Sequence, residues 1–359
     1  MIYHIFKTNT SHLLYQITKN ILLHHNVEDH YFIFIGKDDD KINGYISIYR
    51  SFVFTKYKFF ESNVSLLKSG LIKPQDVILF HSASYSLMFL LMCGGYKHVN
   101  WICWGSGTVI YNTIISRMSA LFKRILYKHL YSIVTLIEPD KQSLIDYFDV
   151  APEKIHVISY YPSYTIRNDI TAYRNSLKIE KNNKLVVYLG NSPHSLSEYI
   201  VALDDLIKFR GKIEIHCMLQ YALDEESKLY TDLLHKGRNL WGNDIYYDKE
   251  YMSLEEYYRY MAKCDIYICG TTRQTGLGAI YNCIRMGKTI YLNGKNYDHI
   301  CSLGIKVKHY DELNVVEQLD LVSKDVCQKN LYALNDYLDV DIVKNKWDRY
   351  YKLIESDKE

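Results

Sequence analysis

The chain has few prolines and glycines and no cysteine pairs of the Cys-x-x-Cys spacing. Its 359 residues include 5 prolines and 17 glycines, which argues against a loop-rich β scaffold. No two of its eight cysteines form a Cys-x-x-Cys pair, so we expect free, buried thiols in a reducing compartment and no zinc site. The longest apolar run, Leu87–Cys93, is far shorter than the roughly 20 residues that span a bilayer. The first residues lack the pattern of a signal peptide, and we expect a protein of the cytosolic side.

Net charge is also small, but it is unevenly distributed. The 43 Lys and Arg against 41 Asp and Glu give +2, too little for general polyanion binding. Between Arg50 and Ile137, however, ten basic residues stand against two acidic ones, so this segment carries +8 and the remainder −6. Such a basic, aromatic segment predicts an anionic surface or ligand on one side, with a solvated basic face as an equal alternative. No nucleic-acid module is recognisable, and we expect no nucleic-acid partner.

The length predicts two domains, and the hydrophobic pattern agrees. Short apolar runs alternate with amphipathic stretches twice, on either side of a polar segment at residues 163–183. This is the pattern of parallel sheets with crossover helices. The strands expected before that segment are Ile2–Phe6, Tyr31–Gly36, Tyr45–Tyr49, Val77–His81, Val99–Trp104 and Ile133–Ile137. Those expected after it are Leu185–Leu189, Lys212–Met218, Ile245–Tyr247, Asp265–Cys269 and Thr289–Leu292.

The expected architecture is therefore α/β, with two Rossmann-like βα domains facing across a cleft and a C-terminal helical tail. We place the domains at residues 1–163 and 184–330. The tail is expected to be helical from Asp311 to Ile354, and its last part, residues 331–359, can pack back on the N-terminal domain. In such folds the ligand lies at the carboxyl ends of the strands.

The second domain contains two glycine turns at strand ends. The stretch from Cys264 to Leu292 reads as a buried strand, a turn and a helix that begins at Gly276 or Gly278. Glycines there let backbone amides approach a phosphate, and the helix dipole favours its negative charge. Arg273 can add a bidentate contact to a diphosphate, with Gln274 beside it.

The matching turn after the first strand of this domain is Gly190-Asn191-Ser192. Its polar side chains can bind a ligand or simply cap the next helix. Tyr246 and Tyr247 end another strand at the same rim and can stack on a base or sugar, although core packing explains either one alone.

Five short motifs occur in an order and at a spacing that resemble glycosyltransferase family 56, the family of TDP-N-acetylfucosamine:lipid II N-acetylfucosaminyltransferases in the GT-B superfamily. These motifs are Gly36–Asp39, Trp101–Gly105, Tyr161–Pro162, Gly190–Ser192 and Arg273–Gly278. The resemblance spans about residues 31–300. It departs from the family pattern at Ser106–Val109, where family members have Asp-Leu-Tyr, which affects the acceptor side.

The resemblance implies a reaction and its partners. A dTDP-linked acetamido-dideoxyhexose would be the donor, and a polyprenyl-diphosphate-linked saccharide of enterobacterial common antigen or O-antigen synthesis the acceptor. The N-terminal domain would bind the acceptor and the second domain the nucleotide sugar. The protein would be attached peripherally to the cytoplasmic face of the inner membrane. Its reaction would need no cofactor. Rival hypotheses are a GT-B-fold nucleotide-sugar epimerase or hydrolase, a transferase with a different donor, and a non-catalytic sugar-nucleotide or lipid-binding module.

Glycosyl transfer needs positive charge at the departing diphosphate and, if the anomeric centre inverts, a base for the acceptor hydroxyl. Gly276, Gly278 and Arg273 serve the first need without a metal. For the base we consider His81, which ends a strand and is expected to point into the cleft, and Asp38. Asp38–Asp40 could instead be a solvated loop. A metal-binding Asp-x-Asp is a further alternative, and we disfavour it. Asp39, Trp104 and Gly105 are expected on the acceptor side.

The basic segment contains a helix pattern from Asn112 to Tyr131. Its apolar stripe is predicted to pack on the sheet. Its cations, Arg117, Lys123, Arg124 and Lys128, are predicted to meet an anionic membrane surface.

Overall fold

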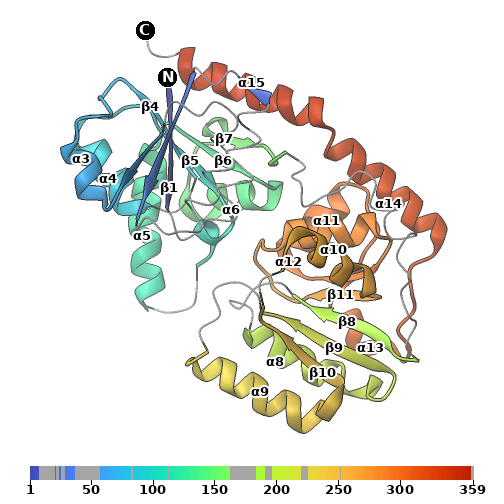
Figure 1. Ribbon diagram of the computed structural model, residues 1–359. Coiled ribbons are helices and arrows are strands. Elements are labelled where there is room, and N and C mark those ends of the chain that lie inside the picture. The colour runs from blue at the N-terminus through green and yellow to red at the C-terminus, as the bar shows by residue number, and fades with distance from the viewer. Residues whose placement is uncertain are drawn as a thin grey trace. The chain divides into compact units, whose positions relative to one another are not determined.

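The structure is a computed structural model that describes residues 1–7, 21, 24–25, 29–36, 57–81, 84–110, 114–161, 183–190, 196–219, 225–250 and 252–356. The chain forms two units, each with one parallel sheet (Figure 1). Unit 1 comprises Met1–Ser163 and Leu338–Glu359, and unit 2 comprises Tyr164–Tyr337. The end of the chain therefore belongs to the unit in which the chain begins.

Unit 1 has a seven-stranded sheet in the order β3-β2-β1-β4-β5-β6-β7. Its strands are β1 (Ile2–Lys7), β2 (His30–Ile35), β3 (Tyr57–Phe60), β4 (Val77–Phe80), β5 (Val99–Cys103), β6 (Ser132–Thr135) and β7 (Ile155–Val157). All neighbouring strands are parallel. Because helices cover a parallel sheet on both faces, a central strand such as β4 can be buried and apolar along its whole length.

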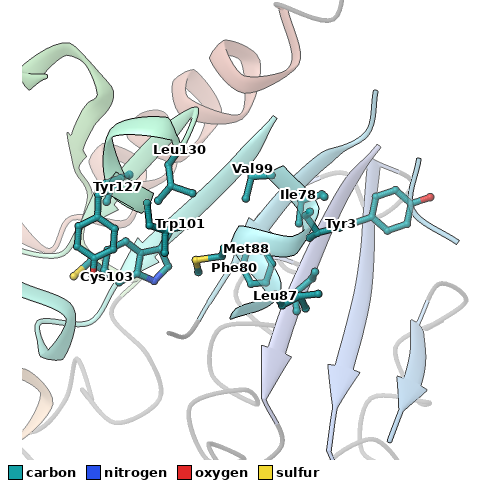
Figure 2. Close-up of a cluster of buried hydrophobic side chains, with 14 of the residues drawn as sticks. Tyr3, Ile78, Phe80, Leu87, Met88, Val99, Trp101, Cys103, Tyr127 and Leu130 are labelled. Atoms are coloured by element: carbon teal, nitrogen blue, oxygen red, sulfur yellow. The ribbon is translucent and has the colours of Figure 1, made fainter. Parts of the chain in front are cut away.

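One face of this sheet packs on an apolar layer of helices. The helices of unit 1 are α3 (Asn63–Lys68), α4 (Tyr85–Cys93), α5 (Ile114–His129), α6 (Glu138–Phe148) and α15 (Val340–Ser356). Figure 2 shows Ile78 and Phe80 of β4 and Trp101 of β5 beside Met88 of α4 and Tyr127 of α5. This layer is the main hydrophobic core of unit 1.

The opposite face is more polar, and α15 covers part of it. Side chains alternate across a strand, so Tyr3 and Ile5 join the apolar core while His4 points to the other side, where its ring stacks on Phe32 at 5.1 Å. The Tyr350 hydroxyl of α15 lies 2.7 Å from Ser132 Oγ. The indole of Trp347 donates to the Ser159 carbonyl at 3.1 Å.

Unit 2 has a six-stranded sheet in the order β10-β9-β8-β11-β12-β13. Its strands are β8 (Leu185–Leu189), β9 (Ile213–Met218), β10 (Ile245–Asp248), β11 (Ile266–Cys269), β12 (Thr289–Leu292) and β13 (Lys308–His309). Its helices are α8 (Leu196–Asp205), α9 (Lys228–Trp241), α10 (Leu254–Lys263), α11 (Leu277–Arg285), α12 (Gly294–Ser302), α13 (Glu312–Val315) and α14 (Lys324–Tyr337). The core between β8, β9, α8 and α9 is apolar and includes Trp241, whose indole donates to the Leu203 carbonyl at 3.2 Å.

Two parallel Rossmann-like sheets and a final long helix confirm the predicted α/β class. The predicted helical tail is present as three helices within residues 311–356, with breaks at 316–323 and 338–339. The prediction missed the short strands β3, β7 and β13. The strand expected at Tyr45–Tyr49 lies outside the described residues.

Candidate functional site

Each sheet contains one point at which the strand order reverses. In unit 2 it lies between β8 and β11, and in unit 1 between β1 and β4. Crossover helices leave on opposite faces at such a point, so the carboxyl ends of the two central strands form the usual ligand crevice of an open α/β sheet.

A cavity in unit 2 lies at its reversal point. It is lined by residues that end β8 and β11 and by one side of α8: Leu189, Gly190, Glu198, Tyr199, Ala202, Ile268, Cys269, Gly270 and Thr271. The Gly190 amide donates to the Ile268 carbonyl at 2.7 Å and fixes the two strand ends together. Gly190 has φ +54°, and a Cβ there would lie 2.3 Å from the Tyr199 hydroxyl. The glycine is thus required by both conformation and space. The predicted partners Asn191 and Ser192 lie outside the described residues.

The turn after β11 brings four predicted donor residues together at the start of α11. Gly276 adopts a left-handed conformation, φ +67°, at the N-cap of that helix. Gly278 has no atom within 4 Å of where its Cβ would be, so the first turn of α11 faces open space. Arg273 is half-buried beside it. Gln274 is only 8% exposed, and its Oε1 has no hydrogen-bond partner among the described residues, which leaves a buried acceptor in the same turn.

Helix α12 holds this turn from behind. The buried Asn296 accepts from the Thr275 amide at 3.4 Å and donates to the Thr275 carbonyl at 2.9 Å. Gly294 lies so close to the Thr272 backbone that a Cβ would fall 2.4 Å from its carbonyl oxygen. The sequence analysis missed both residues. The signal available was the Asn293-Gly294 pair directly after the apolar run of β12.

Tyr246 and Tyr247 lie on the edge strand β10, with β9 between them and β8. The Tyr247 hydroxyl packs on α9, where Gly237 leaves space for it, and reaches the Leu233 carbonyl at 3.4 Å. Burial raises the pKa of Tyr247 well above its usual value. Tyr246 is exposed and stacks on His216 at 4.6 Å. The structure therefore gives Tyr247 a packing role and leaves Tyr246 accessible.

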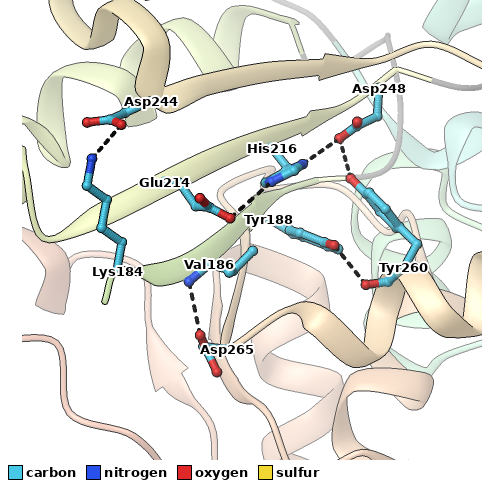
Figure 3. Close-up of polar contacts among 9 residues, drawn as sticks. All are labelled: Lys184, Val186, Tyr188, Glu214, His216, Asp244, Asp248, Tyr260 and Asp265. Atoms are coloured by element: carbon cyan, nitrogen blue, oxygen red, sulfur yellow. Dashed lines mark hydrogen bonds and ion pairs between the residues drawn. The ribbon is translucent and has the colours of Figure 1, made fainter. Parts of the chain in front are cut away.

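A polar network supports this part of the sheet (Figure 3). His216 of β9 lies between two carboxylates, with Nδ1 3.0 Å from Asp248 and Nε2 3.6 Å from Glu214. The Tyr260 hydroxyl of α10 donates to Asp248 at 2.5 Å, and the ring of Tyr260 stacks on Tyr188 at 4.2 Å. These contacts tie α10 to the carboxyl end of β10.

The prediction that His81 of unit 1 points into an open crevice is wrong. The residue follows β4 at the reversal point, but its ring is 1% exposed and stacks on Phe6 at 4.2 Å. Its Nε2 lies 2.8 Å from His4 Nδ1, and His4 Nε2 lies 2.7 Å from His30 Nδ1. Burial lowers the pKa of all three rings, to about 4 for His30 and about 3 for His81. The three histidine rings thus form a buried row, linked by hydrogen bonds, in which all three are neutral.

The other residues predicted for unit 1 have mixed placements. The Trp104 indole donates to the Tyr160 hydroxyl, whose ring stacks on Trp347 of α15. Gly105 has φ +80° and precedes a short turn at Ser106–Thr108. Asp38 and Asp39 lie outside the described residues.

The cations of α5 do not share one environment. Arg124 and Lys128 both bind Asp149, with Arg124 Nη2 at 3.0 Å. Lys123 lies over the Tyr85 ring, 5.3 Å from its centroid, and burial lowers its pKa. Lys123 is thus half-buried, and its contact with an anionic surface stays a prediction. The apolar stripe of α5 is exposed, so the prediction that it packs on the sheet is wrong.

Two Rossmann-like units, each with one reversal of strand order, and a final long helix form the GT-B fold, and solved structures of glycosyltransferases match nearly the whole chain. A glycosyltransferase from Rickettsia africae ESF-5 is 14% identical, with a TM-score of 0.70 and coverage of 99% of this chain and 98% of that one. Anabaena Alr3699/HepE in complex with UDP-glucose is 12% identical, with a TM-score of 0.71 and coverage of 98% and 99%. WaaG, a glycosyltransferase involved in lipopolysaccharide biosynthesis, is 11% identical, with a TM-score of 0.61 and coverage of 99% and 100%.

Sequence comparison identifies the family. Residues 2–331 match the family described as 4-alpha-L-fucosyltransferase glycosyl transferase group 56. The chain belongs to glycosyltransferase family 56 and is a glycosyltransferase. No curated protein matches it significantly.

The close approach at Gly190 predicts a stability difference between two glycine variants of unit 2. Gly190→Ala and Gly211→Ala both place an alanine at positive φ, which costs about 1–2 kcal/mol. Only at Gly190 would the new Cβ meet the Tyr199 ring, whereas Gly211 has no atom within 4 Å; such overpacking costs about 1–3 kcal/mol more. Urea unfolding measures both losses. Equal losses would contradict the tight fit at the cavity.

The buried histidines predict that unit 1 loses stability in mild acid. Their folded pKa values lie below the unfolded value near 6.5, so as pH falls below about 6.5 the unfolded chain binds protons that the folded chain does not. At pH 5 His30 and His81 each cost about 2 kcal/mol, and His4 acts in the same direction. Unfolding at pH 7 and pH 5 measures the loss, and His30→Gln, which cannot be protonated, should reduce it. Unchanged stability across this range would argue against a row of neutral histidines.

Proposed function

We propose that this glycosyltransferase moves an acetamido-dideoxyhexose of the N-acetylfucosamine type from a dTDP-sugar to a polyprenyl-diphosphate-linked saccharide, as in enterobacterial common antigen or O-antigen synthesis. Family membership supports the reaction class, and the five ordered motifs support the donor and acceptor. The observation that carries the proposal is the turn of unit 2 in which Arg273, Gln274 and the open first turn of α11 lie together.

This turn can stabilise the departing diphosphate. The amides at the start of α11 are directed out of the helix N-terminus, which carries partial positive charge. Gly278 leaves space for an anion to approach them, and the guanidinium of Arg273 can bind two phosphate oxygens. Because α12 holds the turn through Asn296 and Gly294, these groups are fixed before the donor binds, which is what electrostatic catalysis requires.

The segment that follows Gly190 is proposed to contact another part of the nucleotide sugar, because the cavity beside Gly190 has room for little more than one water molecule. Gly190 lies at the same end of the sheet as the α11 turn, because β8 and β11 are parallel neighbours. Glu198, which lines that cavity, can accept hydrogen bonds from hydroxyl groups. Asn191 and Ser192 follow Gly190 directly and are proposed as further donor contacts. Asp39, Trp104 and Gly105 are proposed for the acceptor.

The burial of His81 changes the proposed base. A side chain that is 1% exposed and has a pKa of about 3 is badly placed and weakly basic for an acceptor hydroxyl. Asp38 comes three residues after Ile35, the last residue of β2. We therefore propose Asp38 as the base and His81 as a residue that supports the strand ends around β1.

We propose peripheral attachment at the cytoplasmic face of the inner membrane, because a polyprenyl-diphosphate acceptor is embedded in that membrane. Among the described residues no helix has the length and hydropathy needed to cross a bilayer.

The diphosphate contact is tested with Arg273→Ala, which is expected to lower kcat/KM for the donor by about 100-fold, since it removes a charge that acts on the leaving group. Arg273→Lys should recover part of this loss. The matched control is Arg259→Ala on the exposed side of α10, which should leave the rate unchanged. Normal donor kinetics in Arg273→Ala would refute the assignment.

The same assay compares dTDP-, UDP- and GDP-sugars with and without a polyprenyl-diphosphate disaccharide. Transfer to the acceptor that occurs from the dTDP-sugar but not from the UDP- or GDP-sugars, and that persists in EDTA, supports the proposal. Consumption of donor without acceptor would instead indicate an epimerase or hydrolase, and faster transfer from UDP- or GDP-sugars would reassign the donor.

The base is tested with Asp38→Asn and His81→Gln. Loss of a general base lowers turnover by about 100-fold or more, so Asp38→Asn is expected to lower kcat with little change in donor KM. His81→Gln, which can still hydrogen bond to His4, is expected to keep most of the turnover at pH 7. The opposite ranking, with the folded state of both variants verified by melting temperature, would return the role to His81.

A further inference from the structure

We propose that the exposed apolar face of α5, continued by Phe89 and Leu90 of α4, inserts into the boundary between headgroups and acyl chains of an anionic lipid leaflet. This face would be the surface through which the peripheral attachment proposed above occurs. The inference rests on residues of unit 1 alone, so it is independent of which nucleotide sugar is the donor. Electrostatic attraction alone was expected from the sequence; the structure adds hydrophobic insertion.

Helix α5 exposes six large apolar side chains. Their exposed fractions run from 40% for Phe122 to 81% for Ile115. At 3.6 residues per turn they fall within an arc of about 120°, so they form one continuous stripe rather than scattered residues. They are Ile114, Ile115, Met118, Leu121, Phe122 and Ile125. An exposed apolar stripe of this extent is typical of an interaction surface.

Helix α4 extends the stripe sideways. The ring centroids of Phe89 and Phe122 are 5.6 Å apart, and Phe89 and Leu90 are both exposed. Behind this surface the other sides of α4 and α5 pack into the core through Met88 and Tyr127. The apolar face is therefore displayed by helices that are themselves firmly anchored.

The charges beside the stripe match an anionic leaflet. Residues 84–129 contain five Lys and Arg and no Asp or Glu. By helical periodicity Arg117, Arg124 and Lys128 lie along one border of the stripe, while Lys123 lies on the opposite side of the helix. Asp149 binds Arg124 and Lys128, but the surface keeps a positive balance. An amphipathic helix with a cationic border is the usual form of an interfacial anchor.

This pattern favours a bilayer surface over a second copy of the chain. An isologous dimer through the face would bring two cationic surfaces without compensating acids on α4 or α5 together. A bilayer instead offers acyl chains for the stripe and anionic headgroups for its border.

Vesicle binding without any sugar donor tests the proposal. The wild-type protein should sediment with vesicles of phosphatidylglycerol and phosphatidylethanolamine and remain partly bound at about 0.5 M NaCl, where exposed charges are screened. Replacing Ile114, Met118 and Leu121 together by Ser should lower the partition coefficient about 100-fold at both salt concentrations. The matched control is Val315→Ser on α13 of unit 2, which is 78% exposed and should bind normally. Melting temperatures verify that all variants are folded.

Three outcomes would overturn the proposal. Complete release of the wild type at high salt would leave only electrostatic attraction. Normal binding of the triple variant would exclude the stripe. A wild-type dimer in solution that the triple variant loses would show that a second copy covers the face. Transfer to a short-chain acceptor in detergent is expected to persist in the triple variant, so failure of this proposal and failure of the proposed function can be told apart.

Discussion

The contact on which unit 1 depends is made by the last helix of the chain. The sheet has an apolar face and a face with buried polar groups, among them His4, and such groups are costly unless they are hydrogen bonded. Helix α15 brings Tyr350 to Ser132 and Trp347 to the Ser159 carbonyl. Its Tyr351 ring meets the His4 ring edge-on at 6.2 Å. The polar face is thus closed by residues more than 180 positions away in sequence from those that it buries, which explains why the first and last parts of the chain form one unit.

Unit 2 meets a different requirement, because in the proposed function the turn after β11 keeps backbone amides available for the diphosphate. Glycines give the turn after β11 its conformation but no rigidity, since glycine loses the most conformational freedom on folding. Rigidity comes from α12, where Asn296 binds both backbone groups of Thr275 and Gly294 lies against Thr272. The groups that are proposed to face the diphosphate and the groups that hold them in place therefore belong to successive βα connections of the same sheet.

The sequence predicted the strands that are buried on both faces: β4 is apolar at every position, and β12 is a short β-branched and aromatic run that is buried throughout. It did not predict β3, whose Lys58 interrupts the apolar pattern on an edge strand. Periodicity found the apolar face of α5 but misjudged what it meets, because a helical stripe has the same spacing whether it contacts a sheet, a membrane or water. The prediction for His81 was wrong for a related reason. The end of a strand gives the position of a residue, and only the tertiary structure shows that the His81 ring turns back toward His4. Asn296 could not be found from a motif, because its role depends on a contact 21 residues away.

The segment that departs from the family pattern, Ser106–Val109, is held in place by packing. Gly107 lies where any Cβ would fall 2.3 Å from the Trp101 ring, and its carbonyl accepts from the Tyr127 hydroxyl at 3.1 Å. The Thr108 hydroxyl lies 2.8 Å from a carboxylate oxygen of Asp140, and both side chains are buried. These contacts tie the segment to the core of unit 1 directly after Trp104 and Gly105, two of the residues proposed for the acceptor, so a larger residue at position 107 must displace the Trp101 ring.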